Sequence, residues 1–149
     1  MGDGASNSSH KPPESQYEND KSCDRSLIAA PGKQELYAGS GVYISCVELH
    51  TILAKAMGKP QELLGQLVNY FFDDNILAKS VPLQESRAKG KNVLDQRIIR
   101  AIIVYSKKCH LLWVKENKVS SEERFDWGRI IRNKCITARR RLERKLKRQ

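Results

Sequence analysis

The chain has 149 residues, of which 40% are hydrophobic and 30% charged, and its formal net charge at pH 7 is +10. This length and apolar content suit one folded domain rather than two. No run of about 20 apolar residues is present to span a bilayer, and no apolar segment near the first residue is typical of a secretion signal, so the sequence predicts a soluble intracellular protein.

Residues 1–34 are predicted to form a disordered polar leader, and residues 35–149 to form the folded domain. Four Lys or Arg stand against six Asp or Glu in residues 1–35, a net charge of −2. Because this segment has few large apolar side chains, it cannot bury enough surface to offset the entropic cost of ordering. In "ELYAGSGVYIS", a glycine-rich turn flanked by Leu36, Val42 and Ile44 predicts a short extended segment before the first helix.

Two helices are predicted next. Ser45 and Glu48 form a capping box, so a helix should begin there and end at Gly58. Its inward residues are expected to be Val47, Leu49, Ile52, Leu53 and Ala56. Pro60 suits the first turn of a second helix, the most hydrophobic of the chain. Its apolar pairs recur every four residues, as Leu63-Leu64, Leu67-Val68 and Phe71-Phe72.

A short helical piece and a loop are expected to follow. Asp73-Asp74 can cap the segment "NILAKS", which would carry Ile76 and Leu77 inward. Residues 81–92, which include Pro82 and Gly90, are expected to form an exposed polar loop. A solvated loop and a phosphate clamp explain equally well the second basic cluster that this loop carries, Arg87, Lys89 and Lys91.

Asp95 is predicted to cap a long helix. The inward residues of this helix are expected to be Ile98, Ile99, Ile102, Ile103 and Tyr105. Their β-branched run leaves a strand open, but the cap and the length favour a helix. Residues 110–118 fit either a continuation of the helix or a short extended piece. Ser120 and Glu123 form a second capping box, which is expected to begin the last helix.

The last helix is predicted to be two-sided. At about 100° per residue, one narrow sector holds the residues expected to face the core: Trp127, Ile131, Cys135, Ala138 and Leu142. The opposite sector holds Arg129, Asn133, Ile136, Arg140 and Lys147, with Arg132, Arg139 and Arg144 along its edges. From residue 129 to residue 149, ten Lys or Arg stand against one Glu, a net charge of +9.

A charged helix face is ordinarily just solvated, but here that interpretation must account for ten cations and one carboxylate on a single helix. Arg139, Arg140 and Arg141 repel one another by roughly a few tenths of a kcal/mol per pair. Cations near a helix C-terminus do favour the helix dipole, but one or two are enough for that purpose. A localised excess of this size indicates a polyanion partner, which would relieve the repulsion.

The residue types favour double-stranded DNA as that polyanion. Arg can bond to guanine and Asn to adenine in the major groove, which admits an α-helix, and Ile136 could touch a thymine methyl group. Phosphate contacts are predicted for Arg139, Arg141, Arg144, Lys145, Lys147 and Arg148. RNA is less favoured, because its deep major groove does not admit a helix and no aromatic ladder is evident.

Catalytic and metal-binding patterns are missing from the sequence. Its four cysteines, Cys23, Cys46, Cys109 and Cys135, lie far apart without a C-x-x-C pair. Its three histidines, His10, His50 and His110, are isolated, and no nucleophile elbow or phosphate-cradling glycine loop occurs. The sequence therefore predicts a protein that is not an enzyme and needs no cofactor.

Several blocks together resemble the BEN domain family. They are "GSGVYIS", "LLGQLVNYFFDDNILAKS", the basic loop "SRAKGKN", "LDQRIIRAII" and "DWGRIIRNKCITARRR", in that order, and they cover residues 36 to about 144. The resemblance implies a mainly α compact bundle of about five helices that binds DNA in nuclear transcription and chromatin regulators, often repressors. It also implies that the last helix enters the major groove while loops hold the backbone.

Carried onto this chain, the resemblance assigns the groove to Arg129, Arg132, Asn133, Ile136 and Arg140. It assigns the backbone to Lys89, Lys91 and the terminal Lys and Arg residues. Implied partners are corepressor or chromatin proteins and a second copy on a palindromic site. The alternative is a basic amphipathic module that binds an acidic protein or an anionic membrane, with Trp127 as its apolar anchor.

Overall fold

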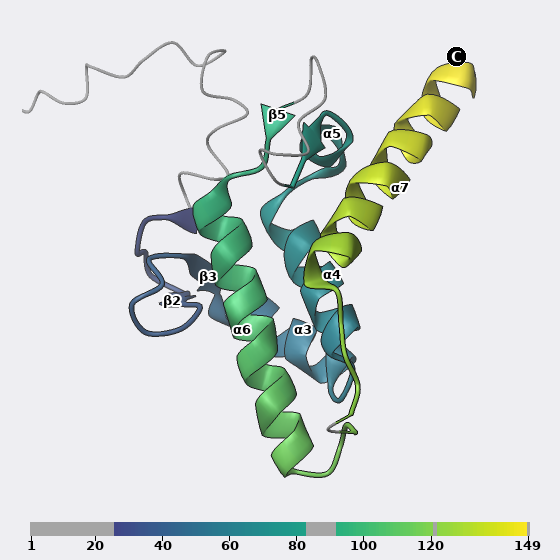
Figure 1. Ribbon diagram of the computed structural model, residues 1–149. Helices are drawn as coiled ribbons and strands as arrows, with labels where there is room; N and C mark the ends of the chain where they lie inside the picture. The colour runs from purple at the N-terminus through teal and green to yellow at the C-terminus, as the bar shows by residue number, and fades with distance from the viewer. Residues whose placement is uncertain (1–25, 83–91, 121, 149) are drawn as a thin grey trace, which may run out of the picture.

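The structure, a computed structural model, describes residues 26–82, 92–120 and 122–148. The helices in these ranges are α3 (Cys46–Ala56), α4 (Pro60–Phe71), α5 (Asp74–Ala78), α6 (Gln96–Lys115) and α7 (Trp127–Arg148). The long helices α6 and α7 lie on different sides of α4 (Figure 1). The predicted mainly α bundle is confirmed, with five helices among the described residues.

A hairpin precedes the first of these helices. Strand β2 (Lys33–Glu35) pairs antiparallel with β3 (Tyr43–Ser45). The Glu35 carboxylate accepts hydrogen bonds from the backbone N–H groups of Gly39 and Gly41, both of which have positive φ. The expected extended segment is therefore one arm of a hairpin. Packed structure begins upstream of residue 35, because Ser26 is already buried. Residues 1–25 lie outside the described residues.

Helix α3 begins where its capping residue predicts. The Ser45 hydroxyl accepts a hydrogen bond from Glu48 N at 3.2 Å. Gly58, with φ +75°, follows the last turn. The expectation that Val47 faces inward is wrong, since its side chain is 73% exposed. At 100° per residue, Val47 lies about 200° around the helix from the buried Leu49, so it points to solvent.

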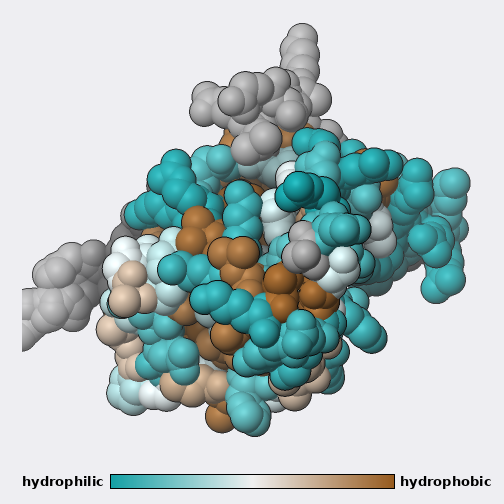
Figure 2. Space-filling model, turned by 60° about the horizontal axis from the view of Figure 1, so that its bottom comes forward, coloured by the Kyte–Doolittle hydropathy of each residue, from teal (hydrophilic) through white to brown (hydrophobic). Residues whose placement is uncertain are grey.

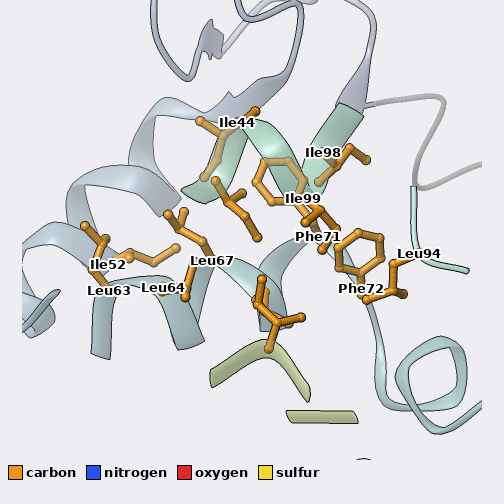
Figure 3. Packing of buried hydrophobic residues seen from close by; sticks show 14 of the residues in the cluster. Ile44, Ile52, Leu63, Leu64, Leu67, Phe71, Phe72, Leu94, Ile98 and Ile99 are labelled. Atoms are coloured by element: carbon orange, nitrogen blue, oxygen red, sulfur yellow. The ribbon is translucent and has the colours of Figure 1, made fainter. Parts of the chain in front are cut away.

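Helix α4 is the centre of the core. Pro60 is its first residue, and all three predicted apolar pairs are buried. In Figure 3, the labelled α4 side chains lie among Ile52 of α3 and Ile98 and Ile99 of α6. One helix therefore holds both of its neighbours by a single wide apolar stripe.

Helix α5 is short and leads into a two-residue strand. Asp73 caps it by accepting a hydrogen bond from Ile76 N at 2.9 Å. Strand β4 (Ser80–Val81) then pairs in parallel with β5 (Asn92–Val93). The expectation of an exposed loop over residues 81–92 is wrong at its beginning, because Val81 and Pro82 are buried. Backbone pairing and the burial of Leu94 draw the two ends of this segment into the fold.

Two segments could have been either helical or extended, the β-branched run after Asp95 and the residues from 110 onward, and both contribute to helix α6. Asp95 accepts a hydrogen bond from Arg97 N and caps a helix of 20 residues. The ambiguous segment after residue 110 is helical as far as Lys115. Beyond the C-cap Glu116, Asn117 has a φ of 60°, and Lys118 N donates to Trp113 O at 2.8 Å. This left-handed residue with its long-reach hydrogen bond is a common C-terminal stop.

Helix α7 begins later than the sequence predicts. Its first residue is Trp127, and Asp126 accepts a hydrogen bond from Arg129 N at 3.0 Å. The predicted capping box is wrong: Ser120 accepts instead from Glu122 N and closes a turn. That turn leads into residues 123–126, which are not helical. Among the described helices, none is both long and apolar enough to cross a membrane.

The capping assignment can be tested by stability. Asp126→Ala is expected to lower the free energy of unfolding by about 1 kcal/mol, because an N–H group in the first turn of α7 loses its acceptor. Ser120→Ala is expected to change it by less than about 0.5 kcal/mol. Urea denaturation of the two variants measures the difference, and a larger loss from Ser120→Ala would contradict the assignment.

Candidate nucleic-acid interface

Helix α7 is held to the domain by one narrow apolar stripe. Ile131, Cys135 and Ala138 are 0%, 1% and 1% exposed, and Trp127 and Leu142 pack against the core from the two ends of the stripe. These are the five residues predicted to face inward, so that prediction is confirmed. The stripe fixes which side of the helix remains exposed.

Small residues allow α7 to approach its neighbours closely. Cys135 and Ala138 stand at the contact, and α4 has Gly65 where it meets the side chain of Lys134. A Cβ atom added at Gly65 would lie 2.9 Å from Lys134 Cε, so even alanine would force that side chain to move. The aliphatic stem of Lys134 therefore crosses α4 at a glycine.

The opposite face of α7 points to solvent. Arg129, Asn133 and Arg140 are exposed, Ile136 is 37% exposed, and Arg132 is half-buried at the edge. The last turns project beyond the rest of the domain (Figure 1). Exposed cations of this end are Arg144, Lys145, Lys147 and Arg148.

Arg139 lies at the edge of the stripe and has partners within the fold. Its Nε donates to the carbonyl oxygen of Ala78 at 3.2 Å, and its Nη2 donates to that of Ser80 at 3.4 Å. These carbonyls belong to the end of α5 and the start of β4. One guanidinium thus ties both elements to α7, and hydrogen bonds from a charged donor are among the stronger ones.

Arg141 lies on the other edge of α7. Its Nη1 is 2.6 Å from Asp74 Oδ2, and the two side chains are 46% and 48% exposed. An ion pair this open to water contributes little to stability because solvent screens it. It does fix which way Arg141 points in the free protein.

Most of the positive charge on α7 is uncompensated. Of its ten Lys and Arg residues, only Arg141 forms an ion pair with a carboxylate among the residues that the structure describes. Glu143 is the single acidic residue of the helix. The exposed face is therefore a cationic surface backed by a rigid apolar contact.

The second basic cluster lies outside the described residues. Arg87, Lys89 and Lys91 fall between β4 and β5, within residues 83–91. Strand β4 contacts both α5 and α7. The described chain just before this segment therefore lies against α7.

The described residues contain no group of three or more His, Cys, Asp or Glu side chains that could hold a metal ion. Burial raises the pKa of the Cys109 thiol. Burial, followed by the charge of Cys109, raises the pKa of the Tyr105 hydroxyl. Both shifts favour the neutral and unreactive forms of these groups.

Sequence reasoning missed two features of this region. Arg139 and Arg141 bond to α5, which lies about 60 residues away in the chain, and no local pattern indicates that. The other feature is a second cationic helix: α6 contains five Lys or Arg and no Asp or Glu in its 20 residues. That signal is visible in the sequence.

Comparison with known proteins places this chain beside two others. It is 35% identical over 115 residues to BEN domain-containing protein 7 of Homo sapiens, an alignment that covers 74% of this chain and 27% of that protein. It is 34% identical over 114 residues to Nucleus accumbens-associated protein 2 of Rattus norvegicus, covering 74% of this chain and 18% of that protein. The chain spans about a quarter or less of the length of these relatives. No family model matches it.

The internal role of Arg139 gives a prediction for stability. Arg139→Ala is expected to lower the free energy of unfolding by about 1.5–3 kcal/mol, because two carbonyl groups lose a charged donor. Its exposed neighbour provides the matched control, and Arg140→Ala is expected to stay within about 0.5 kcal/mol of the parent. Thermal and urea unfolding measure both, and equal effects would show that Arg139 does not hold α5.

Proposed function

Because this chain belongs to the BEN domain family, we propose that it binds double-stranded DNA through the exposed face of α7. The observation that carries this proposal is the two-sided helix. Its apolar stripe is buried, while Arg129, Asn133 and Arg140 face solvent with no carboxylate ion-paired to them among the described residues. The family relationship supports a role in DNA binding, chromatin or transcription regulation.

In this proposal the middle of α7 reads bases in the major groove. An α-helix with its side chains is about 10–12 Å across, which fits that groove. Arg129 or Arg140 can donate two parallel bonds to guanine, and Asn133 can bond to adenine. Ile136 can contact a thymine methyl group, and Arg132 can reach the groove from the edge of the helix. All five side chains are at least partly accessible.

Phosphates would be held by the projecting end of α7 and by the segment between β4 and β5. The cations proposed for this role are Arg144, Lys145, Lys147, Arg148, Arg87, Lys89 and Lys91. Arg139 and Arg141 remain in the proposed set, but each already has a partner within the fold. A phosphate would have to share Arg141 with Asp74 and draw Arg139 away from α5, so we expect both to contribute less.

The wider role we propose is transcriptional regulation in the nucleus, most naturally repression through corepressor or chromatin partners. A second copy on a palindromic site is part of this proposal. The alternative, a membrane-binding helix anchored by Trp127, is disfavoured because Trp127 packs against the core and the stripe behind it is buried. An interfacial helix needs that apolar face free to enter the lipid.

The charge on α7 predicts strongly salt-dependent binding. Each phosphate neutralised by a Lys or Arg releases condensed counterions, so the logarithm of the affinity should fall with the logarithm of salt concentration by about 0.9 per phosphate. Fluorescence anisotropy with a labelled duplex at a series of salt concentrations measures this slope. A slope near zero would remove the proposal.

The two parts of α7 predict two different mutant effects. Asn133→Ala and Arg129→Ala should relax preference at single base positions by about 1–3 kcal/mol, because they remove bonds to base edges. Lys147→Ala should weaken binding to all duplexes alike and reduce the salt slope by about 1. Selection of bound duplexes from a random pool, repeated with each variant, separates the two. If all three variants weakened every duplex equally, binding would be nonspecific.

A further inference from the structure

Helix α6 presents a second cationic surface, which DNA binding by α7 does not use. Arg100, Val104, Lys107, Leu111 and Lys115 recur at spacings of three or four residues and so lie along one strip of the helix. The three cations and Leu111 are exposed, Leu111 to 64%, and Val104 is half-buried. We call these five residues the α6 strip.

The α6 strip alternates cations with apolar side chains and has no acid. None of its three cations forms an ion pair with a carboxylate in the described ranges. Leu112, beside the strip, is also 51% exposed. Figure 2 shows the end of the molecule where α6 finishes, and apolar side chains gather there among hydrophilic ones. Single exposed leucines are ordinary, but two of them beside cations and an apolar cavity form a patch that a partner could cover.

An open apolar cavity borders the strip. It has a volume of about 520 Å³ and lies between α6 and the start of α7, with Lys107 of the strip at its edge. Its apolar lining includes Ile99 and Ile103 from α6 and Phe125, Trp127 and Ile131 from the other side.

The far wall of the cavity is preformed. The rings of Phe125 and Trp127 lie 5.3 Å apart, and His110 packs against Phe125 at 5.1 Å. A pocket of this size with a fixed aromatic wall has room for a large apolar side chain.

We propose that the α6 strip and this cavity together bind an acidic peptide segment of a partner protein. Carboxylates of the peptide would face Arg100, Lys107 and Lys115, and one large apolar residue would occupy the cavity. Charge complementarity selects this occupant, since the strip offers only positive charge. Asp126 at the rim is occupied as the cap of α7 and repels an acidic ligand from that side, so the carboxylates must lie toward Lys107.

Two other polyanions fit the same surface less well. Phosphates of a nucleic acid would pair with the cations, but they would leave Leu111 and the cavity unused. An anionic bilayer could cover Leu111 and Leu112, but a flat lipid surface does not fill a recessed cavity between two helices. A peptide with both acidic and apolar side chains satisfies the cations, the leucines and the cavity at once.

The test is selection of displayed random peptides on the whole chain. Enriched peptides are expected to carry Asp or Glu on both sides of a Phe, Trp or Leu. Their affinity should fall at least about tenfold for the variant Lys107→Glu/Lys115→Glu, the loss expected when two attractive contacts become repulsive. Leu111→Ser changes no charge and no buried contact, and it should also weaken binding.

A charge-matched control separates the site from net charge. Lys55→Glu/Lys59→Glu reverses two exposed lysines elsewhere and should leave peptide affinity within about twofold of the parent. Arg129→Ala/Asn133→Ala should weaken duplex binding and leave the peptide bound, so failure here and failure of DNA binding are distinguishable. Circular dichroism melts of each variant verify folding.

Four outcomes would overturn the proposal. The first is that no peptide is enriched over the Lys107→Glu/Lys115→Glu variant, and the second is that the enriched peptides bind that variant as well as the parent. The third is that vesicles of phosphatidylserine and phosphatidylcholine bind the parent and lose binding in that variant, which would assign the strip to lipid. The fourth is that duplex affinity falls more in that variant than in the Lys55→Glu/Lys59→Glu control, which would assign the strip to phosphates.

Discussion

The burial of Ile131, Cys135 and Ala138 is the contact on which the arrangement of this protein depends. A helix with ten cations and one carboxylate repels itself, and its apolar contact with the rest of the domain, supported by the hydrogen bonds of Arg139, fixes its position. Burying an isoleucine side chain contributes about 1.5–3 kcal/mol. Because the other two residues are small, the helix sits close to α4 and α5, and its wider cationic side must face outward.

Arginines of α7 have different roles according to the side of the helix on which they lie. Arg139 and Arg140 are neighbours in the chain, yet one bonds to the backbone of α5 and β4 while the other faces solvent. A rotation of about 100° per residue makes this difference. The arginine cluster therefore contains residues that bond to the rest of the fold and residues proposed to bind a ligand. The density of charge in the sequence reflects both uses.

Helix α4 makes two separate cationic surfaces compatible in one small domain. Its wide apolar stripe packs against α6, and α7 also lies against it. Each outer helix therefore buries one face on shared scaffold and exposes another. We propose DNA for the surface on α7, where the cations accompany Asn133, and an acidic peptide for the surface on α6, where they accompany leucines and a cavity. Such a domain could hold DNA and a partner protein together.

The sequence by itself determined the helical class, most helix starts and the buried stripe of α7, because side-chain periodicity and caps such as Ser45, Asp73 and Asp95 act over a few residues. It misplaced Val47, which lies on the opposite side of α3 from the buried Leu49. It also misplaced the start of α7, where Ser120 closes a turn and Asp126 caps the helix. Only the tertiary structure decided that β4 and β5 pair, that Arg139 and Arg141 bond to α5, and that Phe125 and Ile103 line one cavity. Those contacts join residues far apart in the chain, and their partners become neighbours only when the apolar faces of α4, α5, α6 and α7 have packed together.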